Sequence, residues 1–126
     1  MIDHVGYLVR DLDAGVARVK TAFGAEVDRT VDRPQWTLFG YYVGQFEIFT
    51  FTDPTVLAAR LPDGVDEAWD HIAWQVDDLE AAMARFPDAR WTGPDLRETA
   101  TEPFDLGAGR HIWTDGLQLI EYARPQ

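Results

Sequence analysis

The chain contains the same strand-and-helix pattern twice. The stretch DHVGYLVRDLDAGVARV begins at Asp3, and DHIAWQVDDLEAAMARF begins at Asp70. At one constant spacing the two copies are identical at the following pairs: Asp3/Asp70, His4/His71, Val9/Val76, Asp11/Asp78, Leu12/Leu79, Ala14/Ala81, Ala17/Ala84 and Arg18/Arg85. A repeat of this kind predicts two copies of one supersecondary unit, because such units bury a common core by packing together.

Each copy opens with a strand and continues as a helix. Apolar residues alternate over 2–9 and over 71–76, which is the period of a strand. Asp11 and Asp78 then stand at the position of a helix N-cap, and apolar residues follow at helical spacing. The pattern therefore predicts two equivalent strand–helix units.

After each helix the apolar period changes to two. Gly24 and Pro87 are expected to end the two helices. Three further strands are predicted in each half, at 25–31, 36–43 and 45–52 in the first and at 89–92, 110–114 and 117–122 in the second. Each module is therefore βαβββ, and the predicted fold class is α+β.

The domain organisation follows from these modules. We expect one domain, 1–126, in which module one spans 1–52 and module two spans 69–126. Segment 53–68 carries two prolines and is interpreted as the linker. Segment 92–109 is too long for a passive connection, and we expect it to form a lid over a site.

Composition excludes several classes of function. A net charge of −11 argues against nucleic acid as a partner, since binding it requires clustered cations. With no cysteine, any metal ligand must come from His, Asp, Glu, Gln or water. No stretch approaches the roughly 20 apolar residues of a membrane span, and no signal segment opens the chain, so we expect a soluble cytoplasmic protein without membrane partners.

Four polar residues interrupt the apolar strands at corresponding places. His4 and Glu47 occupy the first and last strands of module one, and His71 and Glu121 occupy those of module two. A single such residue is usually structural, but recurrence in both modules favours a shared role. A buried carboxylate is stable when it is paired or binds a metal. The set therefore predicts a site for one divalent ion: zinc, nickel, cobalt, manganese or iron.

The doubled "DH[VI]…V.DL.A" pattern, with Glu in the last apolar strand of each half, resembles the vicinal oxygen chelate superfamily (the glyoxalase/bleomycin resistance/dioxygenase fold). The stretch GRHIWTDGLQLIEYARP is most similar to the branch of methylmalonyl-CoA epimerases and glyoxalase I-like lyases. The resemblance implies a cupped mixed sheet around a central cavity, with metal ligands at His4, Glu47, His71 and Glu121. It also implies a homodimer.

The resemblance further implies an isomerase or lyase that abstracts a proton beside the carbonyl group of a small substrate, by way of an enediolate. Glu121 is then the expected general base, with Glu47 as its partner. Trp36 and Trp113 are expected to line the cavity, and Arg110 is expected to bind a carboxylate or phosphate.

Other functions stay open at this point. In the epimerases a separate glutamate lies just before the third strand, and Arg33 occupies that place here, so a hemithioacetal lyase remains an alternative to a thioester epimerase. A small-molecule binding or resistance protein would use the cleft without turnover. A non-haem iron dioxygenase would need two histidines and one carboxylate, which His4, His71 and Glu121 provide, leaving Glu47 surplus.

Overall fold

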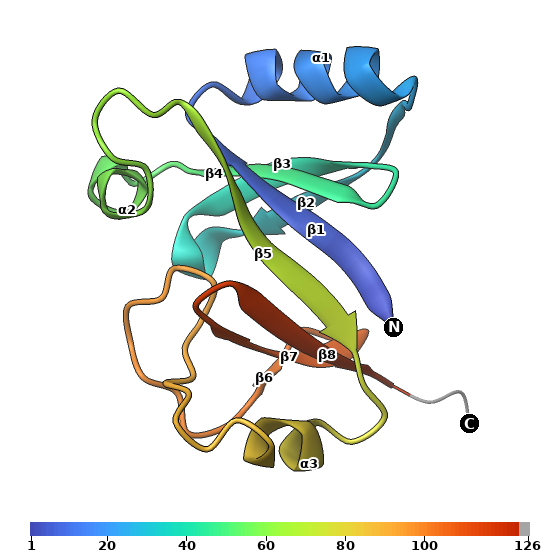
Figure 1. The fold of residues 1–126 in the computed structure, drawn as a ribbon, viewed down its shortest axis with the longest axis vertical. Coiled ribbons are helices and arrows are strands. Elements are labelled where there is room, and N and C mark those ends of the chain that lie inside the picture. Colours follow the sequence, from blue (N-terminus) through green and yellow to red (C-terminus); the bar gives the residue numbers. More distant parts are fainter. Residues whose placement is uncertain (124–126) are drawn as a thin grey trace. The chain divides into compact units, whose positions relative to one another are not determined.

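Each copy of the repeat folds as a strand followed by a helix in the computed structural model (Figure 1). The elements are β1 (Ile2–Val9) with α1 (Leu12–Phe23), and β5 (Glu67–Gln75) with α3 (Leu79–Ala84). Asp11 and Asp78 cap the helices as predicted, each accepting a hydrogen bond from the backbone N–H three residues later. Gly24 ends α1 in the left-handed conformation, with φ of 63°.

The structure describes residues 1–123, and these divide into two compact units. The first unit is His4–Asp70, and the second combines Met1–Asp3 with the chain from His71 onward. The division therefore falls immediately before each of the repeated histidines. Among residues 1–123, no helix is long and apolar enough to cross a bilayer.

The first unit has a mixed sheet with strand order β2-β3-β4-β1. Its remaining strands are β2 (Val27–Arg33), β3 (Leu38–Val43) and β4 (Phe46–Phe51). Strand β1 runs parallel to β4, and the other neighbours are antiparallel. Helix α1 packs on one face against Val9, Val43 and Ile48. The other face contributes Leu8 and Phe49 to a separate core.

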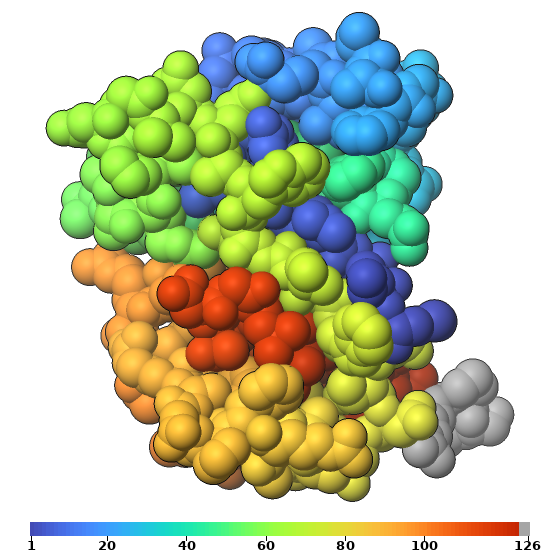
Figure 2. Space-filling view, viewed as in Figure 1, coloured from blue at the N-terminus to red at the C-terminus, as the bar shows by residue number. Residues whose placement is uncertain are grey.

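The second unit has the strand order β5-β8-β7-β6, with β5 parallel to β8. Its remaining strands are β6 (Phe104–Asp105), β7 (Gly109–Thr114) and β8 (Leu117–Tyr122). Helix α3 packs through Leu79 on Ile112 and Leu119. In both units one helix thus covers one face of the sheet, and Figure 2 shows the outer sides of α1 and α3 at the molecular surface.

The α+β class and the two βαβββ modules are confirmed. Segment 53–68, interpreted as the linker, contains a helix, α2 (Pro54–Arg60), because Asp53 caps it and proline is tolerated in a first turn. Two local strand predictions are wrong. Trp36 lies in a short 3₁₀ helix (Pro34–Trp36) and not in a strand. Segment 89–92 forms only isolated bridges at Thr92.

The second module takes its missing strand from the long loop. Strand β6 lies inside 92–109 and pairs with β7 through Phe104 and His111. The side chain of Arg90 holds the loop by hydrogen bonds to the carbonyl of Leu96 and the hydroxyl of Thr99, at 3.1 and 3.0 Å. Helix α3 ends at Ala84, earlier than the proline that was expected to stop it. A lid role for the loop stays a prediction.

Candidate functional site

His4 and Glu47 lie together in the first unit, on the sheet face opposite α1. The register pairs Gly6 of β1 with Glu47 of β4, and alternation places His4 on the same face as Gly6. Both side chains are buried, with exposed fractions of 2% and 5%. The distance from His4 Nε2 to Glu47 Oε1 is 3.8 Å. An imidazole and a carboxylate are therefore held side by side away from bulk water.

Tyr42 positions the carboxylate of this pair. It lies directly across from Glu47 on β3, and its hydroxyl donates a hydrogen bond to Glu47 Oε2 at 3.0 Å. Its ring meets the His4 ring edge to face, with centroids 5.3 Å apart. Sequence reasoning missed Tyr42, although strict alternation in its strand, read from the Gly44 turn, placed it on this face.

His71 supplies the corresponding face of the second unit. It is 6% exposed on β5, two residues before Ala73, which pairs with Gln118 of β8. His71 and Gln118 therefore lie on the same face of their sheet. Gln118 is 3% exposed, and its Nε2 lies 2.9 Å from His111 Nδ1. A donating amide nitrogen leaves Oε1 as the outward acceptor.

The oxygen of Gln118 is a buried acceptor that needs explanation. Among the described residues, Gln118 Oε1 is buried and accepts no hydrogen bond. Buried polar atoms in folded proteins almost always have a partner. A missing ligand, ion or water is one of the usual reasons for such an atom, so Gln118 is a candidate metal or substrate ligand.

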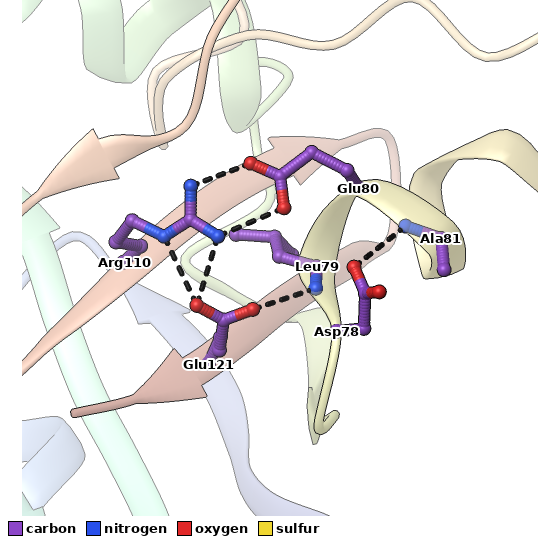
Figure 3. A network of polar contacts seen from close by, with 6 residues as sticks. All are labelled: Asp78, Leu79, Glu80, Ala81, Arg110 and Glu121. Atoms are coloured by element: carbon purple, nitrogen blue, oxygen red, sulfur yellow. Dashed lines mark hydrogen bonds and ion pairs between the residues drawn. The ribbon is translucent and has the colours of Figure 1, made fainter. Parts of the chain in front are cut away.

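Glu121 does not share this face, and the prediction of Glu121 as a ligand beside His71 and as general base is wrong. Figure 3 shows its carboxylate beside the start of α3, where Oε2 accepts from the backbone N–H of Leu79 at 2.8 Å. Its Oε1 accepts from Nε and Nη2 of Arg110 at 3.1 and 2.8 Å. Side chains alternate along β8, so Glu121 and Gln118 point to opposite faces.

Arg110 is likewise engaged on the helix-covered face. Besides Glu121, its guanidinium donates to both carboxylate oxygens of Glu80, at 2.6 and 2.8 Å (Figure 3). The hydrogen bonds from Arg110 lower the pKa of Glu80 to about 2, and the two carboxylates raise the pKa of Arg110. The predicted role of Arg110 as a substrate anchor is contradicted, because its donors are used between β7, β8 and α3.

The two predicted cavity tryptophans are placed differently. Trp113 is 6% exposed on β7, directly across from Gln118, with its ring nearly parallel to that of His111 and 5.7 Å away. It therefore belongs to the site face of the second unit. Trp36 is half-buried against the core that contains Phe49 in the first unit. That both tryptophans line one cavity stays a prediction.

The aspartate before each histidine has a structural role. Asp3 accepts a hydrogen bond from the hydroxyl of Tyr122 at 2.7 Å. Asp70 forms an ion pair with Arg60. These contacts hold the strand position next to each histidine, which gives a physical reason for the aspartate in both copies.

Sequence reasoning missed Gln118 because it compared the strands from the wrong reference point. Gln118 is the second residue of β8, as Glu47 is the second residue of β4. Gly6 and Ala73, equivalent positions of the repeat, pair with Glu47 and Gln118 respectively. Counting from the hairpin turn rather than searching for the nearest glutamate would have identified the position.

Comparisons with known proteins agree with this architecture. A family profile described as the Glyoxalase/Bleomycin resistance protein/Dioxygenase superfamily matches residues 3–112. Among solved structures, methylmalonyl-CoA epimerase from Mycobacterium tuberculosis is 18% identical, with a TM-score of 0.75 over 98% of this chain and 88% of the other. No curated protein sequence matches the chain.

Two further solved structures show the same fold. A variant of Streptomyces coelicolor methylmalonyl-CoA epimerase, in complex with 2-nitronate-propionyl-CoA, is 20% identical, with a TM-score of 0.70 over 98% of this chain and 97% of the other. A hypothetical protein from Bacillus halodurans is 12% identical, with a TM-score of 0.71 over 100% and 96%. At these identities the likeness establishes the fold.

Proposed function

The chain belongs to the Glyoxalase/Bleomycin resistance protein/Dioxygenase superfamily, and from this premise we propose that it is a metal-dependent enzyme that moves a proton next to a carbonyl group. Epimerase-like and glyoxalase I-like reactions both belong to this class. The epimerases among the similar structures favour the first. The observation that carries the proposal is the buried pair of His4 and Glu47, repeated in the second unit as His71 and Gln118.

The donor atoms of these residues fit a divalent ion. His4, Glu47, His71 and Gln118 would supply two imidazole nitrogens, one carboxylate and one amide oxygen, a set that suits zinc, nickel, cobalt, manganese or iron. Binding would give Gln118 Oε1 the partner it lacks among the described residues. When bound, such an ion supplies Lewis-acid stabilisation of the negative charge that develops on the substrate oxygens.

Glu47 is the proposed proton carrier. With Glu121 held beside α3, Glu47 is the carboxylate on the site face of β4, where it is 5% exposed. The hydroxyl of Tyr42 binds Oε2 and limits rotation of the carboxylate, so that Oε1 keeps one orientation on the side of His4. A fixed carboxylate that accepts and returns a proton is the requirement of general acid–base catalysis.

Metal content tests the proposal first. We expect purified untagged wild-type protein to hold about one transition-metal ion per chain by plasma mass spectrometry, and His71→Ala to lose it. Glu121→Gln is the matched control and keeps the metal. The metal-loaded protein should then exchange the acidic proton of methylmalonyl-CoA or of a hemithioacetal with deuterium, followed by NMR. Wild-type protein that contains no metal and does not bind added zinc, nickel, cobalt, manganese or iron would contradict the proposal.

A second candidate is a non-haem iron dioxygenase. With Glu121 held beside α3, His4, His71 and Glu47 would supply the two histidines and one carboxylate that such an iron site requires. Oxygen uptake by the iron-loaded protein with a catechol or a keto acid distinguishes this function. Uptake without proton exchange would favour the dioxygenase.

We also propose that the chain forms a homodimer. Ile72 and Trp74, which share one face of β5, are exposed by 45% and 44%. Large apolar side chains exposed together on a strand are typical of an interaction surface. Sedimentation analysis should give twice the monomer mass of 14.3 kDa, and Trp74→Glu should weaken the association.

A further inference from the structure

Two arginines of β2 lie on the site face of the first unit. We infer that Arg29 and Arg33 bind an anionic group, a carboxylate or a phosphate, on the small molecule that the protein takes. The inference rests on the proposed function in one respect: it assigns the class of ligand to the same face that carries His4 and Glu47.

The register of the sheet places both arginines on that face. Arg29 pairs with Tyr42, and Tyr42 pairs with Glu47, so the three form one row across three strands. The guanidinium carbon of Arg29 lies 4.2 Å from the centroid of the Tyr42 ring, which confirms the common side. Arg33 pairs with Leu38, four residues further along β2 than Arg29, and an even spacing puts it on the same face.

Both guanidinium groups lack a carboxylate partner within residues 1–123, although the chain has 22 acidic residues. Other arginines of the first unit are paired, for example Arg18 with Glu67 and Arg60 with Asp70. The adjacent acids of β2, Asp28 and Asp32, occupy the alternate positions of the strand, so their side chains point to the other face. The two cations are therefore available to an external anion.

The spacing suits a small ligand. Neighbouring strands lie about 4.8 Å apart, so Arg29 stands two strands, or about 10 Å, from Glu47. A molecule with a reactive carbonyl at Glu47 and an acid group a few bonds away would span this distance. The planar fork of an arginine recognises carboxylate and phosphate with two parallel hydrogen bonds. The Arg29 guanidinium also packs over the face of the Tyr42 ring, a cation–π contact that holds it in place.

The position of Arg33 on the site face indicates a role in binding an anion, which the sequence pattern did not predict. An arginine cannot act as the general base that the epimerase pattern has there, because it stays protonated. On the site face it instead supplies positive charge. In the second unit, Glu80 and Glu121 form ion pairs with the guanidinium of Arg110. We therefore assign the anion-binding role that was expected of Arg110 to the arginines of β2.

The test is an NMR titration of arginine Nε–Hε resonances with inorganic phosphate and, separately, with malonate at constant ionic strength. We expect saturable shifts at Arg29 and Arg33 in wild-type protein, and binding at least tenfold weaker in the Arg29→Gln/Arg33→Gln double variant. The control is Arg85→Gln/Arg97→Gln, which removes the same charge from two other arginines that have no carboxylate partner within residues 1–123. It should bind both anions like wild type.

A third variant tests whether the planar guanidinium group is required in addition to its positive charge. Arg29→Lys/Arg33→Lys keeps the net charge, and we expect it to bind several-fold more weakly than wild type, because a lysine cannot make the paired contact. The anion that binds more tightly identifies the group. Absence of saturation in wild type, or equal loss in the Arg85/Arg97 control, would overturn the inference. Metal content is measured separately, so an anion site in a metal-free protein would refute the proposed function alone.

Discussion

The two units start alike and differ after their helices. In the first, α1 has 12 residues and β2 has 7. In the second, α3 has 6 residues and β6 has 2, while a long loop precedes β6. The site faces also differ, since Glu47 with Tyr42 in the first unit corresponds to Gln118 with His111 in the second.

This comparison separates framework from chemistry. Both units retain the capped helix, the parallel pair of first and last strands, and the buried histidine. One unit presents a charged side chain across from the first strand, and the other presents a neutral amide at the equivalent register position. The repeat thus provides two equivalent places, and the residue that fills each place decides whether it carries charge.

The largest expected effect tests this asymmetry. Glu47→Gln makes the first unit resemble the second and removes the proposed proton carrier, so proton exchange should fall by about 10²- to 10⁴-fold. Gln118→Glu should keep the metal and most of the exchange. Deuterium incorporation into methylmalonyl-CoA, measured by NMR beside metal content, checks both. Equal loss in the two variants would show that the faces are functionally equivalent.

The next effect compares the two helix-covered cores. Ile48 and Ile112 are both fully buried, one under α1 and the other under α3. Each Ile→Ala change should lower the free energy of unfolding by about 2–5 kcal/mol, because it removes buried methyl groups and leaves a cavity. Urea denaturation of both variants measures it. A single transition that shifts equally would show one cooperative fold, whereas two transitions would show that the units unfold separately.

A smaller effect compares the helix caps. Asp11 accepts from Ala14 N at 3.1 Å, and Asp78 accepts from Ala81 N at 3.0 Å. Each Asp→Ala change should lower the free energy of unfolding by about 1 kcal/mol, because it leaves a backbone N–H of the helix without its acceptor. Asp→Asn at the same positions is the control and should be nearly neutral. Alanine variants that unfold at the same urea concentration as wild type would contradict this prediction.

The smallest expected effect concerns the exposed pair of Glu80 and Arg110. Arg110 lowers the pKa of Glu80 from 4.5 to about 2, so the ion pair stabilises the fold above pH 4.5, and this stabilisation is lost as the pH falls towards 2. The Glu80 side chain is 60% exposed, so screening by solvent keeps the contribution of this ion pair to stability small. Denaturation of wild type and Glu80→Gln should differ slightly at pH 6 and coincide near pH 2. A difference that grows on acidification would refute this assignment.

Much of the fold was predictable because its signals are local. The caps at Asp11 and Asp78 and the alternation around His4 and His71 depend only on neighbouring residues, and the structure confirms them. The membership in the superfamily followed from the same repeat and is confirmed. By contrast, β6 could not be predicted, because two residues of strand exist only through their pairing with β7.

The sequence by itself determined the repeat, the capped helices and which histidine is buried in each module, His4 in the first and His71 in the second. Tertiary structure alone decided which acidic or amide residue joins them. Successive side chains of a strand point to opposite faces, so the register at one hairpin assigns Gln118 to the site and Glu121 to α3. The same geometry engages Arg110 in ion pairs and places Arg29 across from Tyr42 and Arg33 across from Leu38, since pairing across strands depends on contacts that no local pattern encodes.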